Sequence, residues 1–156
     1  MKKKIMICVI VVLALIALVP IPQNINRTFY GVETYTGENV NIIIDMNYLR
    51  FLLLEDKMYG EITVESKNEL TVYGEHMSHQ GMFPTNNDDK TMHCFAGFRY
   101  DIEKDSMLPV VIYLSRDFDK ILISDRAVGI TKQYIGHIEE NKAEEVLEYF
   151  VGYADR

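Results

Sequence analysis

PVVIYLSRDFDKILIS, residues 109–124, contains the clearest β-hairpin of the sequence and indicates its fold class. Two apolar segments, 109–115 and 120–124, flank the four-residue connection 116–119. β-Branched and aromatic residues are favoured in strands, and so short a connection joins antiparallel neighbours. Every position from 110 to 114 is apolar or aromatic, so we expect this strand to be central and covered on both faces.

The same alternation of short apolar segments and polar connections recurs on both sides of this hairpin. Further strands are predicted at residues 28–35, 39–44, 48–54, 59–65, 70–74, 92–100 and 128–136. Consecutive strands joined by tight turns favour an antiparallel meander over β-α-β units. We therefore predict a mainly β (α+β) fold whose antiparallel meander closes into either a sandwich or a barrel.

One amphipathic helix is predicted near the C-terminus, at residues 141–151. Val146, Leu147 and Phe150 share one face at helical spacing. Asn141 is placed to cap the first turn. We expect the apolar face to pack on an open face of the sheet, and the alternative is that these three residues face a partner protein.

The N-terminus joins a basic region, residues 1–4, to an apolar segment, residues 5–21. This order is typical of export signals. Because Pro20 follows the unbroken apolar run 5–19 of this segment and no motif of small residues marks a cleavage site, we predict a retained transmembrane helix that contacts the lipid bilayer. A cleaved signal is the alternative. Residues 22–27 are the expected linker, and residues 28–156 the extracytoplasmic domain of a single-pass cell-membrane protein, or of a secreted protein if the signal is cleaved.

The charge of the predicted outer domain excludes one class of partner. Residues 2–4 hold three of the 16 Lys and Arg, so the remaining chain has 13 against all 23 acidic residues, a net charge of −10. Such a surface repels the nucleic-acid backbone, and no nucleic-acid partner is expected. The same charge argues against anionic lipid headgroups as partners of the domain. Cys94 is the only thiol beyond the apolar segment, so no disulfide can form within the domain.

The only cluster of potential metal ligands is HMSHQGMFPTNNDDKTMHC, residues 76–94. His76, His79 and His93 with Asp88 form a candidate set of three nitrogens and one oxygen, which would suit zinc. Complete zinc signatures such as H-E-x-x-H are absent from the sequence. The Asn and Asp residues after the proline are also typical of turns, so the favoured interpretation is a loop without a metal.

Catalytic motifs are equally absent from the sequence. There is no G-x-S-x-G nucleophile elbow, and the chain has no Trp to form a sugar-stacking platform. Cys94 alternates with other small or apolar residues and is predicted to be a core residue. We therefore expect no catalytic residue, no cofactor and a non-catalytic module that binds a protein or small ligand. The alternatives are a metal-binding exported protein that uses residues 76–94 and a structural subunit of a membrane complex.

Two segments resemble a pattern found in small uncharacterised exported bacterial proteins. These are YLRFLLLEDKMYGEITVE, residues 48–65, and VVIYLSRDFDKILIS, residues 110–124. The matching features are Gly60 after a hairpin connection and the hairpin with the sequence RDFDK. The resemblance covers residues 40–135 and implies an N-terminal apolar segment with a β-rich outer domain. It implies no activity, cofactor or ligand.

Overall fold

The protein is a nine-stranded antiparallel sheet with one short helix, counted over the part of the chain that its computed structural model describes. The described residues are 6–7, 10, 12, 14, 17–52, 57–67, 69–73, 76–84, 91–101, 106–127 and 130–150. The elements are β1 (Ile21–Glu33), β2 (Asn39–Arg50), β3 (Lys57–Glu65), β4 (Leu70–Tyr73), β5 (His76–Pro84), β6 (Thr91–Asp101), β7 (Ser106–Ser115), β8 (Lys120–Ala127), β9 (Ile130–His137) and α2 (Ala143–Tyr149).

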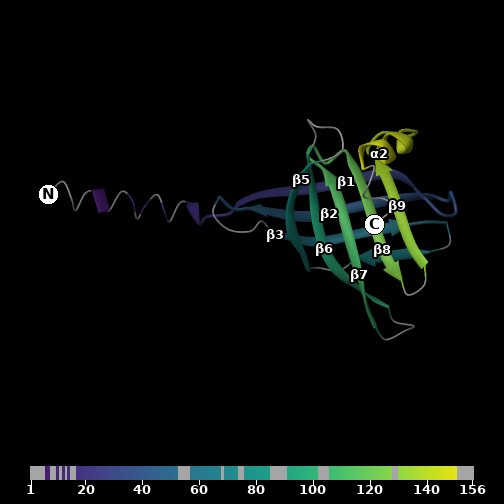
Figure 1. Cartoon of the computed structure of the whole chain (residues 1–156), viewed down its shortest axis with the longest axis horizontal. Coiled ribbons are helices and arrows are strands. Elements are labelled where there is room, and N and C mark those ends of the chain that lie inside the picture. Colours follow the sequence, from purple (N-terminus) through teal and green to yellow (C-terminus); the bar gives the residue numbers. More distant parts are fainter. Residues whose placement is uncertain are drawn as a thin grey trace.

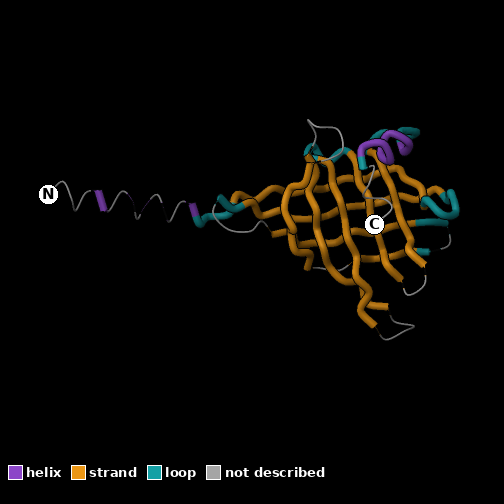
Figure 2. Tube along the Cα trace, viewed as in Figure 1, coloured by secondary structure: helices purple, strands orange, loops and turns teal. Residues whose placement is uncertain are grey.

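The sheet curls until its two ends meet (Figures 1 and 2). Its order is β2-β1-β9-β8-β7-β6-β5-β3-β4, and an additional β2–β3 pairing brings the first strand back to β3. β4 and β5 pair in turn with two different parts of β3, and the β3–β5 contact has only three residue pairs. The meander is therefore nearly closed into a barrel. This confirms the predicted antiparallel meander and decides for a barrel over a sandwich.

The barrel interior forms the main hydrophobic core, and the two-residue period of the strands creates it. In β2 every second residue from Val40 to Tyr48 is buried, whereas the residues between them are exposed or half-buried. The fully buried side chains opposite them come from strands all around the sheet. They include Phe29, Ile62, Tyr73, Phe95, Ile112 and Ile121.

The hairpin 109–124 forms most of β7 and β8, and β7 is covered on both faces as predicted. Val110, Ile112 and Leu114 belong to the core inside the barrel. Tyr113 packs instead against a second buried cluster on the outer face. There its ring lies 6.4 Å from that of Phe150, the residue that follows α2 (Ala143–Tyr149).

α2 covers the outer face of the sheet over β1, β8 and β9. Val146 and Phe150 are completely buried there. Their partners from the sheet are Met92, Leu122 and Ile135. The expected packing of the apolar helix face on the sheet is thus confirmed.

α2 begins later than predicted, and its predicted N-cap is wrong. The helix spans Ala143–Tyr149, and Lys142 occupies the N-cap position without a side-chain hydrogen bond. Asn141 has a φ of 68°, a left-handed conformation that Asn tolerates better than most residues. It turns the chain toward the helix and does not cap it. Residue 151, the predicted last helical residue, lies outside the described part of the chain.

Residues 22–27, predicted to be a linker, are part of β1, so the predicted linker is wrong. β1 pairs with β2 from Ile21 to Val32 but with β9 only from Tyr30 to Glu33. Its first half therefore has a neighbour on one side only. Pro22 can lie there because a proline lacks an N–H group but fits a strand that is paired on a single side.

Two further boundaries differ from the predictions. Residues 76–84, predicted to be part of a loop, form β5 and pair with β6 through an irregularity between His79 and Gly81. Residues 39–44 and the beginning of the predicted strand 48–54 belong to one continuous strand, β2. In both segments polar residues or a glycine interrupt the apolar pattern, although the backbone hydrogen bonding continues.

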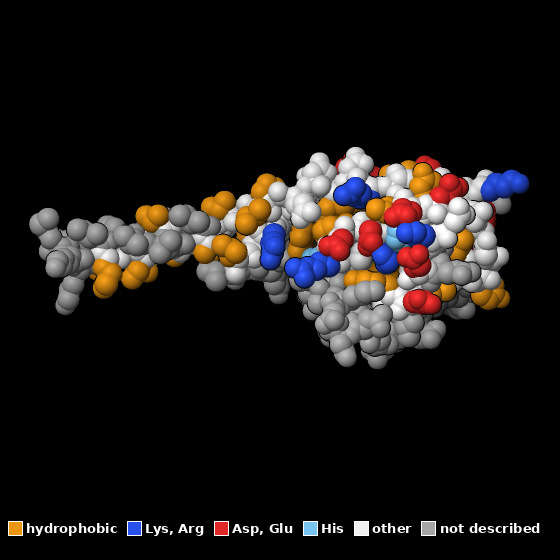
Figure 3. Space-filling view, turned by 90° about the horizontal axis from the view of Figure 1, so that it is seen from above, with side chains coloured by type: hydrophobic (Ala, Val, Ile, Leu, Met, Phe, Trp, Pro, Cys, Tyr) orange, Lys and Arg blue, Asp and Glu red, His pale blue; other side chains and the backbone are white. Residues whose placement is uncertain are grey.

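The described residues of the N-terminal segment lie outside the barrel, beyond the beginning of β1 (Figure 1). Among the described residues, no helix has both the length and the apolar character required to span a membrane. The described hydrophobic side chains of the segment are exposed (Figure 3). They are Met6, Ile7, Ile10, Val12, Leu18 and Val19. The transmembrane helix over residues 5–21 stays a prediction.

Candidate functional site

The four predicted metal ligands are placed only in part. His93 lies in β6 and is buried, whereas Asp88 is outside the described residues. His76 and His79 lie in β5, with backbones opposite β3 and β6, but their side chains are outside the described part. Among the described side chains no group of three or more His, Cys, Asp or Glu could hold a metal ion. The zinc site stays a prediction.

A pocket of about 430 Å³ lies at the end of the barrel where β1 begins and β2 ends. We call this the pocket end. The lining residues are Gln23, Tyr48, Arg50, His93, Arg116, Asp117 and Phe118. They come from β1, β2, β6 and the connection between β7 and β8, so the closure of the sheet brings them together. Pockets of about 300–1,000 Å³ are typical of small-molecule sites, which often lie in the mouths of barrels.

Aromatic rings surround His93 at the bottom of this pocket. The imidazole is only 6% exposed and stacks on Phe118, with ring centroids 5.1 Å apart and planes 8° from parallel. Tyr48 meets the imidazole edge-on at 5.5 Å, and Phe95 lies on another side at 6.1 Å. These arrangements are the favourable ones for aromatic pairs. His93 therefore belongs to an aromatic cluster that forms the bottom of the pocket.

Phe118 reaches this cluster through an unusual backbone conformation. Its φ is 54°, in the left-handed region that bulky residues rarely adopt. The ring nevertheless lies inside the barrel and is only 7% exposed. Strained conformations of this kind persist only where the surrounding structure holds them, and they concentrate at functional sites.

Ser115 and Asp119 hold the connection that carries Phe118. The Ser115 hydroxyl donates to Asp119 Oδ1 at 2.5 Å and accepts from the N–H groups of Asp119 and Lys120, both at 3.0 Å. Lys120 Nζ lies 2.7 Å from Asp119 Oδ2. Burial alone would raise the pKa of Asp119, but the hydrogen bonds from Lys120 and Ser115 outweigh it and lower that pKa. The carboxylate is therefore ionised near neutral pH.

Two arginines lie at the rim of the pocket without an ion pair among the described residues. Arg50 is the last residue of β2, and Arg116 is the first residue after β7. Both are exposed and both line the pocket. The only carboxylate in the described lining is that of Asp117. The local charge is thus positive, in contrast to the net charge of −7 of the whole chain.

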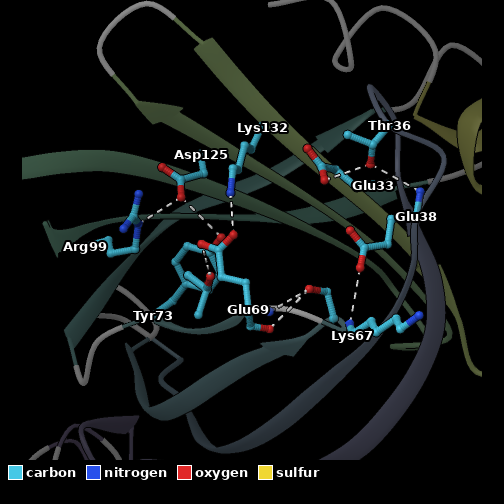
Figure 4. A network of polar contacts seen from close by, with 11 residues as sticks. Glu33, Thr36, Glu38, Lys67, Glu69, Tyr73, Arg99, Asp125 and Lys132 are labelled. Atoms are coloured by element: carbon cyan, nitrogen blue, oxygen red, sulfur yellow. Dashed lines mark hydrogen bonds and ion pairs between the residues drawn. The ribbon is translucent and has the colours of Figure 1, made fainter.

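The opposite end of the barrel holds paired charges, and we call it the network end (Figure 4). Arg99 Nε donates to Asp125 Oδ2 at 2.9 Å, and the Tyr73 hydroxyl donates to the same oxygen at 3.3 Å. Burial and the adjacent negative charge of Asp125 raise the pKa of Tyr73, so its hydroxyl stays a donor. The side chain of Asp125 is only 1% exposed.

A second ion pair at the network end joins β9 to the chain just before β4. Lys132 Nζ lies 2.7 Å from Glu69 Oε2, and the Thr71 hydroxyl donates to Glu69 Oε1 at 3.2 Å. The hydrogen bond from Lys132 lowers the pKa of Glu69, and the same bond raises the pKa of Lys132. Figure 4 shows the side chains of Lys132 and Glu69 pointing toward one another.

Cys94 does not have the properties of a catalytic nucleophile. The thiol is free and buried on β6. Burial raises its pKa to about 11, so it is almost entirely protonated at neutral pH. The thiolate is the reactive form of cysteine, and here it is scarce.

The helix residues considered for partner binding differ in exposure. Val146 and Phe150 are buried by the chain's own sheet, whereas Leu147 is 40% exposed. Leu147 lines a groove of about 490 Å³ between α2 and the beginning of β2, together with Tyr30 of β1. A partner on this face stays a prediction. Of the three residues, only Leu147 has an exposed side chain that a partner could contact.

The sequence contained one signal that could have identified the pocket. Phe118 is an aromatic residue in a connection whose other members, Arg116, Asp117 and Asp119, are all charged. Such connections are polar when they face solvent. An aromatic residue there indicates that its side chain folds back under the strands. For Arg50, Gln23 and Tyr48 no comparable local signal exists, because their proximity depends on closure of the barrel.

Comparisons of the chain with protein-family models, with curated proteins and with solved structures found no match. The resemblance to small exported bacterial proteins therefore stays a prediction.

Proposed function

We propose that this chain is a non-catalytic binding module, anchored in the cell membrane through residues 5–21, whose barrel holds a small ligand at the pocket end. The observation that carries this proposal is the placement of Phe118. A left-handed backbone conformation costs free energy, and here it directs an aromatic ring to the bottom of a pocket of ligand size.

The chemistry of the described lining favours binding over catalysis. Gln23, Tyr48 and the two arginines supply hydrogen-bond donors that can orient a ligand. Among the described lining residues, Asp117 is the only carboxylate, and there is neither a serine nor a cysteine to act as a nucleophile. His93 and Asp117 both belong to the lining, but no serine or cysteine nucleophile accompanies them among the described lining residues.

The exposed apolar side chains of the N-terminal segment support the membrane part of the proposal. Leu18 and Val19 immediately precede Pro20 and are about half exposed. Isolated exposed hydrophobic residues are common, but a continuous apolar segment outside a folded domain favours insertion into a bilayer. Gln23 of the pocket follows this segment directly, so the pocket end would face the membrane surface.

Ligand-observed NMR with a library of small organic fragments tests the proposal on the full chain in uncharged detergent micelles. We expect a subset of fragments to bind the wild-type protein and to lose binding in Phe118→Gly. Glycine adopts the positive φ readily, so the connection is retained while the ring at the bottom of the pocket is removed.

Leu147→Ala is the matched control, because it shortens a side chain in the groove beside α2 and leaves the pocket intact. The same fragments should bind this variant as they bind the wild type. Fragments that bind Phe118→Gly as well as the wild type, or a library without any binder, would contradict the proposal.

A further inference from the structure

We infer that the ligand of the pocket carries an oxyanion, a phosphate or carboxylate group, which Arg50 and Arg116 hold together. This inference rests on the proposed binding function and adds the chemical class of the ligand. It starts from the observation that these two arginines line the same pocket and make no ion pair among the described residues.

Four described basic side chains elsewhere have an acidic partner, whereas Arg27, Lys57 and Lys67 make no ion pair among the described residues and do not line the pocket. The ion pairs are Arg99–Asp125, Lys120–Asp119, Lys132–Glu69 and Lys142–Glu139, with N–O distances of 2.7–2.9 Å. Arg50 and Arg116 make no such pair within the described part of the chain, although acidic residues outnumber basic ones by 23 to 16. Two unpaired guanidinium groups that share one pocket form a site suited to an anion.

Arginine also fits the geometry of an oxyanion. The planar guanidinium group presents parallel N–H donors that match the oxygens of a carboxylate or phosphate in a bidentate contact. Arg50 ends β2 and Arg116 begins the connection after β7, so they approach the pocket from two separate elements. An anion between them would receive donors from two directions.

The rest of the pocket determines the remainder of the ligand. Tyr48, Phe118 and His93 offer ring surface below the arginines. This surface favours an apolar or planar group attached to the oxyanion. Asp117 at the rim disfavours a second negative group nearby. The ligand is therefore a small amphipathic anion.

The oxyanion can come from a free solute or from a lipid headgroup. Gln23 is two residues beyond Ile21, the end of the apolar segment, which is about 7 Å along the strand. If that segment is anchored, the headgroup phosphates lie within reach of the pocket. Phosphate chemistry is common to both sources, and the experiment must separate them.

Two probes make this separation in two-dimensional NMR titrations of the full chain in uncharged detergent. One probe is inorganic phosphate, and the other is the short-chain lipid dihexanoyl phosphatidylglycerol. We expect saturable shifts at pocket residues, with affinity about tenfold weaker in Arg50→Met and in Arg116→Met. Affinity should also fall as NaCl rises from low to moderate concentration.

Arg27→Met is the matched control, because it removes an equal charge from an exposed position of β1 that does not line the pocket. Its affinity should equal that of the wild type. Arg50→Lys retains the charge without the bidentate donors and should keep part of the affinity. Both positions are exposed, and retained peak dispersion in the spectra will show that the variants are folded.

Arginine-dependent binding of both probes supports the inference with a free ligand, and arginine-dependent binding of the lipid alone supports it with a membrane ligand. Failure of both probes, or equal binding by the double variant Arg50→Met/Arg116→Met, overturns it. If fragments bind the wild type and the double variant equally well, the proposed binding function holds and only the oxyanion inference is wrong. If no fragment and neither probe binds at the pocket, both the binding function and the oxyanion inference are wrong.

Discussion

At the network end of the barrel Arg99 is bound to the buried Asp125, whereas at the pocket end Arg50 and Arg116 have no ion pair among the described residues. The same side-chain type thus serves different purposes at the two ends. A buried carboxylate must be compensated, so Arg99 is tied to the stability of the fold. The exposed charges of Arg50 and Arg116 are solvated by water and need no protein counter-charge, so these side chains can bind a ligand.

The aromatic residues repeat this contrast. Tyr73 at the network end is fully buried, and its hydroxyl is used internally by Asp125. Phe118 at the pocket end is held in a conformation that costs free energy. Charged and aromatic side chains thus pair with one another at the network end, whereas the pocket end holds a strained residue. This is the pattern expected when one end stabilises the fold and the other binds.

The largest effect should come from comparing Arg99→Leu with Arg50→Met. Removing Arg99 leaves the carboxylate of Asp125 buried without its counter-charge, which should cost about 3–5 kcal/mol of unfolding free energy. Arg50 is exposed and unpaired, so its replacement should change stability by less than about 0.5 kcal/mol. Urea denaturation of the two variants beside the wild type measures both values.

A double variant sharpens this result. Arg99→Leu/Asp125→Leu removes both charges and should be more stable than Arg99→Leu alone, because no uncompensated carboxylate remains. Equal losses in the two proteins would show that packing of the arginine side chain, and not its charge, stabilises the network end.

Phe118→Gly should destabilise the protein by about 2 kcal/mol. The lost aromatic burial costs about 3–5 kcal/mol, and relief of the left-handed backbone returns about 1–2 kcal/mol. Phe118→Ala loses the same burial without this relief, so it should be the less stable of the two. Thermal unfolding of both variants makes the comparison, and the reverse order would show that the backbone at this position is not strained.

Asp119→Asn tests the hydrogen bonds that hold the connection 116–119. The variant should lose about 1 kcal/mol at neutral pH, since the charge-assisted bond to Lys120 disappears. The folded pKa of Asp119 is lowered, so its stabilisation is present above the unfolded value of about 3.9 and is lost as the pH falls through the folded pKa. The difference between wild type and variant should therefore shrink below about pH 4, and a difference independent of pH would contradict this account.

Among the ion pairs and hydrogen bonds tested, the smallest effect is expected for Lys132→Met at the network end. The Lys132–Glu69 pair is partly exposed, so its loss should cost only about 0.5 kcal/mol and less in high salt. The Glu69 contribution is present above about pH 4.3 and lost as the pH falls through its lowered pKa. The Lys132 contribution is present below about pH 10.4 and lost as the pH rises through its raised pKa. Chemical denaturation from pH 3 to pH 11 should show the variant deficit only between these limits.

Much of the fold was predictable because its signals are local. The hairpin 109–124 contains two apolar strands and a short polar connection, and β7 and β8 follow it closely. The apolar face of α2 was likewise evident from the spacing of Val146 and Phe150. Apolar residues recur every two positions in a half-buried strand and about every 3.6 positions in an amphipathic helix. Both periods involve nearby residues, so they can be recognised in the sequence alone.

The segments that were predicted wrongly are held in place by contacts with residues distant in the sequence. Residues 22–27 look like a linker because of Pro22, yet β2 pairs with all of them. Residues 76–84 look like a loop because His, Gly and Pro interrupt the apolar pattern, yet β6 pairs with them. In both cases a neighbouring strand supplies the hydrogen bonds that outweigh weak local propensity.

The candidate site was the least predictable part. Arg50 and Arg116 meet only because the sheet closes, and no spacing rule relates them. His93 was considered as a metal ligand, whereas its described contacts are with aromatic rings. Of the pocket residues, only Phe118 could have been identified from the sequence, because it is an aromatic residue in an otherwise charged connection.

Hydrogen–deuterium exchange of the backbone amides, measured on the full chain with and without a saturating fragment from the NMR library, tests most directly which end binds. The account predicts slower exchange at residues 46–50 and 115–120, beside the pocket, with residues 69–73 and 130–134 at the network end unchanged. Slower exchange confined to the network end, or to the groove beside α2, would contradict it.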